Sequence, residues 1–138
     1  MNIKITVEYD GTNYCGWQIQ TNGESIQGVL ERAISTFFGT PIRIIGSGRT
    51  DAGVHAIGQA ANFFVDKEYD LFRISRGLNA LTPADITVKT VEIVPDSFDA
   101  RRNGRSRVYE YRILNRATPS PFCLNRAWHI HEALDVRA

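Results

Sequence analysis

The chain contains 138 residues, of which 43% are hydrophobic and 22% are charged, and its 16 basic and 15 acidic residues leave a formal net charge of +1. This is the composition of a globular chain that is long enough for one hydrophobic core and some additional structure. The sequence has no run of about 18 apolar residues and begins with a strand-like alternation instead of a signal peptide, so we expect a cytoplasmic chain that does not cross a membrane.

The first part of the chain reads as alternating strands and helices. Residues 3–9 alternate apolar and polar side chains, which predicts a strand with one buried face, and an Asp-Gly turn ends it. Residues 26–37 then place apolar side chains at helical spacing. Ser25 is suited to cap the start of this helix, and Gly39 lies just past its end.

Two strands and a second helix are predicted next. Residues 42–45, of which three are isoleucines, predict a short strand, and residues 59–65 alternate, with a glycine-rich loop between the two segments. Residues 71–81 predict a helix that a proline stops, and residues 86–94 predict another strand. The order βαββαβ indicates an α+β fold of the ferredoxin-like (split βαβ) type, an antiparallel sheet with both helices on one face, which we assign to residues 1–96.

The pattern then changes. Residues 107–115 alternate so that Tyr109 and Tyr111 share one face, which predicts a strand whose aromatic face needs a cover, and we expect Tyr111 to lie in a core. Two prolines open a loop that Trp128 closes, and the last residues resemble the first turn of a helix. We interpret residues 97–138 as the start of a second lobe that this sequence does not complete.

Positive charge is concentrated in one stretch. Residues 101–116 contain six arginines and one glutamate, a net charge of +5, which leaves −4 for the rest of a chain whose total is +1. Such a run is most often a solvated face, but interleaved aromatic residues favour contact with RNA phosphates here. The candidate phosphate-binding residues are Arg101, Arg102, Arg105 and Arg107.

Residues 46–56, with the sequence GSGRTDAGVHA, surround a carboxylate with glycines. The three glycines allow positive φ and a close approach of the backbone to a ligand. If the segment is extended, Arg49 and Asp51 fall on one face, where the guanidinium favours the ionised carboxylate while burial acts in the opposite direction. The alternative is a surface turn with a weak ion pair.

Two aromatic residues lie in the loop after the first strand. The rings of Tyr14 and Trp17 could stack on an unpaired base, at roughly 1 to 3 kcal/mol per base. For Trp17 the alternative is an anchor in the core.

Metal ligands show no recognisable pattern in the sequence. Cys15 and Cys123 lack a CxxC partner, so neither a zinc site nor a disulfide framework is indicated. His55 follows Asp51 by four residues, but the glycines around Asp51 argue against the helix that would bring the two together. We therefore predict no metal site.

Four motifs follow one another along the chain: YDGTNYCGWQ at 9–18, GRTDAGVHA at 48–56, FDAR at 98–101 and RVYEYRILN at 107–115. In this order, and with AWHIHEALDV near the end, they resemble the tRNA pseudouridine synthase A (TruA) family. The resemblance implies a pseudouridine synthase fold and an enzyme that isomerises uridine to pseudouridine in tRNA without a cofactor.

The resemblance also implies roles for three residues. Asp51 is the catalytic residue, which either adds covalently or stabilises a sugar-centred intermediate. Arg49 positions Asp51 and fills the space that the target nucleotide leaves. Tyr109 lies against the target base and takes part in proton transfer at C5.

Family members bind tRNA across a homodimer and modify the anticodon stem-loop. They also have a second α/β lobe after this point. We therefore expect part of the active cleft to lie outside residues 1–138, and this stretch alone not to be fully active.

Two other functions compete with this interpretation. A noncatalytic RNA-binding module could use the same sheet, but the predicted strands lack the glycine-flanked aromatic pattern of an RNA recognition motif. A small phosphate-ester hydrolase could use Arg49 in an anion-binding loop, but Asp51 would repel the phosphate.

Overall fold

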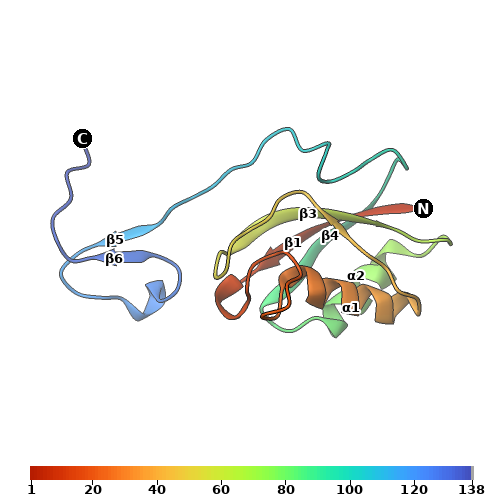
Figure 1. The fold of residues 1–138 in the computed structure, drawn as a ribbon, viewed down its shortest axis with the longest axis horizontal. Helices are drawn as coiled ribbons and strands as arrows, with labels where there is room; N and C mark the ends of the chain where they lie inside the picture. The colour runs from red at the N-terminus through yellow and green to blue at the C-terminus, as the bar shows by residue number, and fades with distance from the viewer. Residues whose placement is uncertain (138) are drawn as a thin grey trace. The chain divides into compact units, whose positions relative to one another are not determined.

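The computed structural model describes residues 1–137, which form two compact units, Met1–Arg105 and the stretch from Ser106 onward (Figure 1). Among the described residues, no helix combines the length and the apolar character that crossing a membrane requires.

The first unit has the predicted ferredoxin-like topology. Its sheet has the strand order β2-β3-β1-β4, and every neighbouring pair is antiparallel. The predicted α+β fold is therefore confirmed. In chain order the elements are β1 (Asn2–Tyr9), the 3-10 helix η1 (Gly11–Asn13), α1 (Ile26–Phe38), β2 (Ile45–Gly46), β3 (Ala56–Phe64), α2 (Leu71–Leu81) and β4 (Ile86–Val94).

Both helices begin and end on local signals. The Ser25 side chain accepts the Gly28 N–H at the start of α1, and Gly39 ends this helix in the left-handed conformation at φ 71°. Asp70 caps α2 by accepting the Phe72 N–H. The predicted cap of the first helix is confirmed.

The core lies between the sheet and the two helices, which cover the same face (Figure 1). Ile3, Ile5 and Val7 project from alternate positions of β1 and are completely buried. Leu30 of α1 and Ile74 of α2 are buried in the same cluster. Each such side chain contributes roughly 1.5 to 3 kcal/mol by leaving water.

Two buried asparagines hold a segment on the opposite face of the sheet. Asn2 Nδ2 donates to the carbonyls of Pro95 (3.0 Å) and Phe98 (2.9 Å), and Asn62 Oδ1 accepts the Ala100 N–H at 2.8 Å. These bonds keep the residues that follow β4 with the first unit, whereas the domain boundary predicted from the sequence falls at residue 96.

The prediction of a strand over residues 42–45 is wrong, because β2 comprises only Ile45–Gly46. Side chains of α1 occupy the backbone donors that a strand would use: the Ile42 N–H donates to Ser35 Oγ at 2.9 Å, and the Ile44 N–H donates to Glu31 Oε1 at 3.0 Å. β3 also begins three residues earlier than the predicted strand over 59–65.

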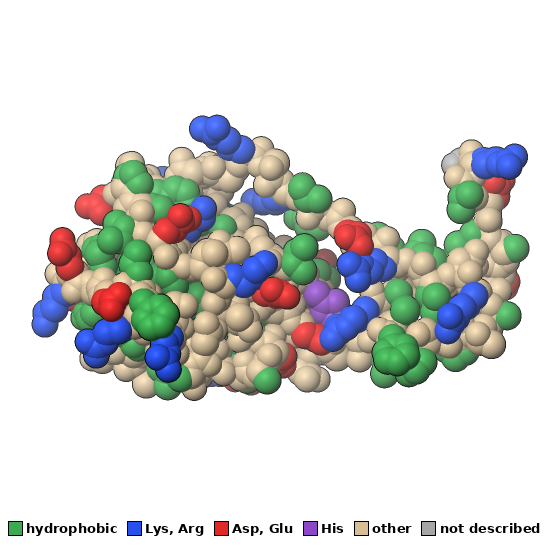
Figure 2. Space-filling view, turned by 180° about the vertical axis from the view of Figure 1, so that it is seen from behind, with side chains coloured by type: hydrophobic (Ala, Val, Ile, Leu, Met, Phe, Trp, Pro, Cys, Tyr) green, Lys and Arg blue, Asp and Glu red, His purple; other side chains and the backbone are tan. Residues whose placement is uncertain are grey.

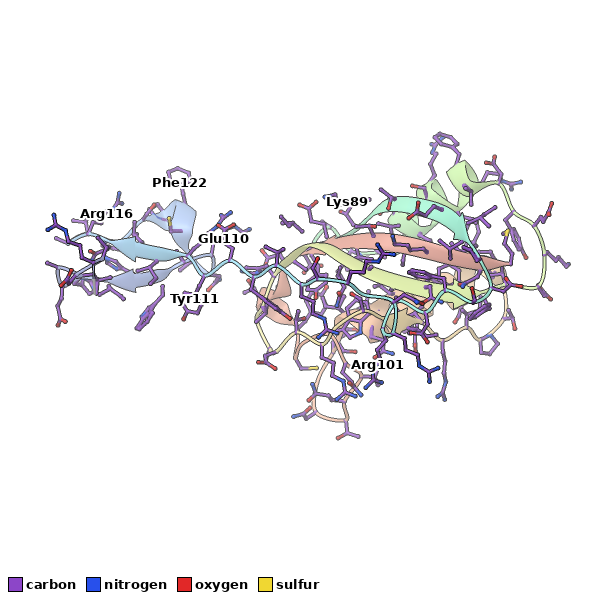
Figure 3. All side chains as sticks on the ribbon, turned by 90° about the horizontal axis from the view of Figure 1, so that it is seen from above. Lys89, Arg101, Glu110, Tyr111, Arg116 and Phe122 are labelled. Carbon is purple, nitrogen blue, oxygen red and sulfur yellow. The ribbon has the colours of Figure 1, made fainter. Side chains whose placement is uncertain are left out.

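The second unit contains a small parallel ladder of β5 (Ile113–Asn115) and β6 (Trp128–Ile130), with the 3-10 helix η2 (Pro121–Cys123) between them. The prediction of one strand over residues 107–115 is therefore wrong for its first six residues, because in the described chain the ladder starts only at Ile113. Tyr111 is 78% exposed, which contradicts its predicted place in a core. Its ring lies near that of Trp128 in an edge-to-face arrangement, with 6.4 Å between the ring centroids (Figure 3).

Candidate functional site

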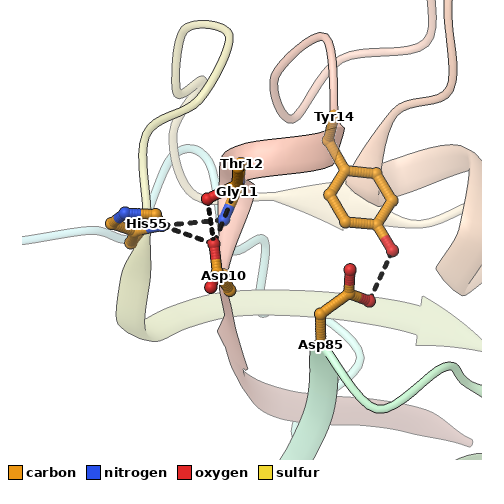
Figure 4. A network of polar contacts seen from close by, with 6 residues as sticks. All are labelled: Asp10, Gly11, Thr12, Tyr14, His55 and Asp85. Atoms are coloured by element: carbon orange, nitrogen blue, oxygen red, sulfur yellow. Dashed lines mark hydrogen bonds and ion pairs between the residues drawn. The ribbon is translucent and has the colours of Figure 1, made fainter. Parts of the chain in front are cut away.

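Two loops of the first unit meet beside the sheet, residues 10–17 after β1 and residues 47–55 between β2 and β3. The Trp17 N–H donates to the Thr50 carbonyl at 3.0 Å, and the Gly53 N–H donates to the Tyr14 carbonyl at 3.3 Å. The Gly11 N–H donates to Nδ1 of His55 at 2.9 Å (Figure 4). Two motifs that are far apart in the sequence are thus joined through their backbones.

Glycines of the first loop make this contact possible. A Cβ on Gly11 would lie 2.0 Å from the Val54 carbonyl oxygen, and one on Gly16 would lie 2.5 Å from the Thr50 carbonyl oxygen. Gly16 also has φ +112°, which side chains disfavour. These glycines serve the packing of one loop on the other.

Asp51 begins a tight turn at the centre of the second loop. The Val54 N–H donates to the Asp51 carbonyl at 3.1 Å, and Gly53 has φ 80°, the conformation that a type II turn requires at its third position. The Asp51 side chain is exposed. Of the three glycines at positions 46, 48 and 53, only Gly53 takes the predicted positive φ; Gly46, at the end of β2, and Gly48 do not.

The expected contact between Arg49 and Asp51 is not formed. In the part of the chain that the structure describes, no ion pair joins them, and both side chains are exposed. Between them, Thr50 is tied to the core, because its Oγ1 hydrogen-bonds the Tyr9 hydroxyl at 2.8 Å. The two charged residues therefore flank an anchored residue and remain available to a ligand.

A buried glutamine holds the start of the same loop. Gln59 of β3 is 9% exposed, and its Oε1 accepts from Ser47 Oγ at 2.7 Å while its Nε2 donates to the Gly48 carbonyl at 2.5 Å. The loop is thus fixed upstream by Gln59, in the middle by Thr50 and downstream by His55. Sequence reasoning missed Gln59 and Thr50 as anchors because neither carries a charge or lies in a recognisable pair.

The prediction that Tyr14 and Trp17 stack on a base is contradicted by their burial. Tyr14 is 8% exposed and Trp17 is 3% exposed, so neither ring offers a free face, and Trp17 is the core anchor that was its alternative. The Tyr14 hydroxyl donates to Asp85 Oδ1 at 2.6 Å (Figure 4). Burial, together with this hydrogen bond and the charge of Asp85, raises the pKa of Tyr14 well above its ordinary value.

A compact turn presents the first two arginines of the basic stretch. Asp99 Oδ1 accepts the backbone N–H groups of Arg101 and Arg102, both at 2.9 Å, and the Asp99 N–H donates to Asn103 Oδ1 at 2.7 Å. The side chains of Arg101, Arg102 and Arg105 are exposed. On the face of the first unit seen in Figure 2, acidic and basic side chains are interspersed, and Figure 3 shows Arg101 on the segment after β4.

The remaining predicted site residues lie in the second unit. Tyr109 is 73% exposed in the irregular segment before β5, and Arg107 is also exposed. The structure brings Arg49 and Asp51 into one anchored loop, and it leaves Tyr109 and Arg107 in a different unit.

Comparison of the sequence with known proteins identifies a family that it matches. A family model described as tRNA pseudouridine synthase matches residues 5–101, which include both loops. The chain is 48% identical over 136 residues to tRNA pseudouridine synthase A of Afipia carboxidovorans, with 98% of this chain and 56% of that protein covered. It is 52% identical over 136 residues to the protein of the same name from Rhodopseudomonas palustris, with 98% and 55% covered.

A third relative, tRNA pseudouridine synthase A of Geotalea uraniireducens, is 46% identical over 134 residues, with 97% of this chain and 55% of that protein covered. The chain thus spans about half the length of the curated relatives it matches. Because the family model covers well over half of the chain, the chain belongs to the tRNA pseudouridine synthase family.

Proposed function

We propose that this protein isomerises uridine to pseudouridine in tRNA and that Asp51 is its catalytic residue. The observation that carries the proposal is the exposed Asp51 carboxylate at the start of a turn that three internal anchors hold, in a chain of this family. A carboxylate held in this way needs little reorganisation when positive charge develops near it.

The reaction needs no oxidant or reductant. The bond between uracil N1 and ribose C1′ breaks, the base turns, a bond forms between C5 and C1′, the proton at C5 leaves, and N1 takes up a proton. An anion close to the sugar or base assists either by forming a covalent adduct that later breaks down or by stabilising positive charge at C1′. Both routes use the same carboxylate, and no cofactor is needed for either.

Arg49 and, by family resemblance, Tyr109 are the other residues that we propose to take part in the reaction. Arg49 is exposed and is paired with neither Asp51 nor another described carboxylate at salt-bridge distance, so its guanidinium is available to take the place of a nucleotide that has left the helical stack. Tyr109 has an exposed ring and hydroxyl, which suits a residue that lies against the base and moves the C5 proton.

We propose that the basic turn after β4 binds RNA phosphates. Arg101 and Arg102 are exposed on a backbone that Asp99 and the two buried asparagines hold in place. Phosphate contacts supply most of the affinity for a nucleic acid, whereas the carboxylate supplies the chemistry. By family resemblance the RNA is the anticodon arm of a tRNA, bound by a homodimer in the cytoplasm.

The experiment is an assay of the protein, at its full natural length, on tRNA transcripts labelled with tritium at uridine C5. We expect tritium release together with pseudouridine in the nuclease digest, located in the anticodon arm by mass spectrometry. Tight tRNA binding with neither tritium release nor pseudouridine would support the rival noncatalytic RNA-binding module and overturn the proposal.

A further inference from the structure

We propose that His55 is a positioning residue, which fixes the turn that carries Asp51 through the δ nitrogen of its imidazole ring. This inference rests on the proposed function for its effect on turnover. The structural part, that His55 holds the turn, stands on contacts within the first unit.

The Nδ1 atom of His55 meets two residues of the neighbouring loop (Figure 4). It accepts the Gly11 N–H at 2.9 Å, and it lies 3.2 Å from Asp10 Oδ1. The bond from Gly11 forms when Nδ1 is unprotonated, whereas a protonated Nδ1 can donate to Asp10. Both contacts use the same ring nitrogen, so the δ position is the one that binds the loop.

Asp10 and Gly11, which His55 contacts, belong to a segment that is itself fixed to the sheet. Asp10 Oδ1 also accepts the N–H of Thr12 at 3.0 Å and its hydroxyl at 2.5 Å, which stiffens η1. The Asp10 N–H donates to the Asp85 carbonyl at 2.9 Å, immediately before β4. A contact with residues 10 and 11 is therefore a contact with a rigid support.

The last residues of the Asp51 turn contact this support. The Val54 carbonyl lies so close to Gly11 that a Cβ there would be 2.0 Å away, and the Gly53 N–H donates to the Tyr14 carbonyl at 3.3 Å. His55 adds a side-chain bond at this end of the turn. Loss of that bond would weaken the attachment of the turn to η1 and let the Asp51 carboxylate move relative to Arg49.

The test compares three substitutions at one position. His55→Asn keeps polar atoms at the δ position, His55→Gln moves them to the ε position, and His55→Leu removes them. The readouts are the single-turnover rate of pseudouridine formation, the tRNA dissociation constant, and hydrogen exchange of the amides of residues 51–54. Asn79→Ala is the control, because it removes the bonds of Asn79 to Val88 and lowers stability without touching either loop.

We expect His55→Gln and His55→Leu to lose roughly 10²-fold in rate, as a displacement of about 1 Å can cause, with tRNA affinity changed by less than about twofold. Amide exchange over residues 51–54 should accelerate in both variants, and His55→Asn should recover most of the rate and of the protection. Asn79→Ala should lower the melting temperature and leave the rate unchanged.

Equal exchange in all three variants and the wild type, or equal losses in His55→Asn and His55→Gln, would overturn the inference. An inactive wild-type protein would instead overturn the proposed function. In that case the exchange measurement would still decide whether His55 holds the turn.

Discussion

The indole ring of Trp17 packs against the α-carbon of Gly46, and a Cβ on Gly46 would lie 2.5 Å from the indole Nε1. Trp17 is 3% exposed, and its ring centroid is 6.2 Å from that of Tyr9 at the end of β1. The glycine that ends β2, just before the Asp51 loop, is therefore required by a buried tryptophan of the other loop.

This contact predicts the effect of Gly46→Ala. The added methyl group collides with a buried ring that has no free space to move into, so we expect the free energy of unfolding to fall by about 1 to 3 kcal/mol, the usual cost of overpacking. Gly58→Ala in β3 is the matched control, since the nearest atom to a Cβ there is Thr6 Cγ2 at 4.0 Å. Urea unfolding of both variants measures the effect, and equal stability for the two would contradict the assigned role of Gly46.

The buried Tyr14 hydroxyl predicts a loss of stability at alkaline pH. Burial and the hydrogen bond to Asp85 raise the pKa of Tyr14 above its ordinary value of 10.0. The folded state thus holds this proton more tightly than the unfolded state, so the contribution of Tyr14 to stability is full below 10.0 and declines as the pH rises above that value.

Unfolding by urea from about pH 8 to about pH 11 measures this decline, and Tyr14→Phe should remove it. The difference in unfolding free energy between wild type and variant isolates Tyr14, because the ionisations of other groups cancel. A difference that does not change with pH would show that the hydroxyl is not held as the structure has it.

The basic turn predicts the salt dependence of tRNA binding. Replacing Arg101, Arg102 and Arg105 together with alanine should weaken binding and flatten the slope of log affinity against log salt, by roughly 0.7 to 0.9 for each true phosphate contact.

A control with the same change in charge is available on and beside α2, where Lys67, Arg73 and Arg76 are exposed. The triple alanine variant of these residues should leave the slope nearly unchanged. If both triple variants alter the slope equally, the arginines after β4 act only through net charge and belong to a solvated face.

We expect removal of the Tyr109 hydroxyl and removal of its ring to have different effects on turnover and on tRNA binding. The side chain is 73% exposed, so Tyr109→Phe should leave the melting temperature unchanged. If the hydroxyl moves the C5 proton, the same variant should lose roughly 10² to 10⁴ in single-turnover rate. Tyr109→Leu should also weaken tRNA binding, because the stacking face is removed. If turnover is normal in Tyr109→Phe and impaired in Tyr109→Leu, Tyr109 only stacks on the base and does not move the proton.

The sequence predicts those elements that local chemistry determines. Ser25 and Gly39 bound α1 because each satisfies orphan backbone groups within a few residues of itself, and the alternation in β1 and β4 follows from one buried sheet face. These signals are sufficient to predict the order βαββαβ and hence the ferredoxin-like topology.

The elements that the sequence did not predict depend on distant residues. Ser35 accepts the backbone N–H of Ile42 and Glu31 accepts that of Ile44, and no periodicity in this segment indicates these hydrogen bonds. Trp17 is buried because Gly46 leaves room for it, and Thr50 is anchored because its hydroxyl bonds to Tyr9, which is 41 positions away in the sequence. Each outcome requires knowledge of which segment packs on which.

The central claim, that the Asp51 carboxylate performs the chemistry, is tested most directly by Asp51→Asn in the protein at its full natural length. The measurement is single-turnover pseudouridine formation on a tRNA transcript, beside the dissociation constant for the same RNA. Because the amide keeps the shape of the side chain but removes its charge, we expect turnover to be abolished while affinity changes by less than about twofold. Turnover close to that of the wild type would contradict the account.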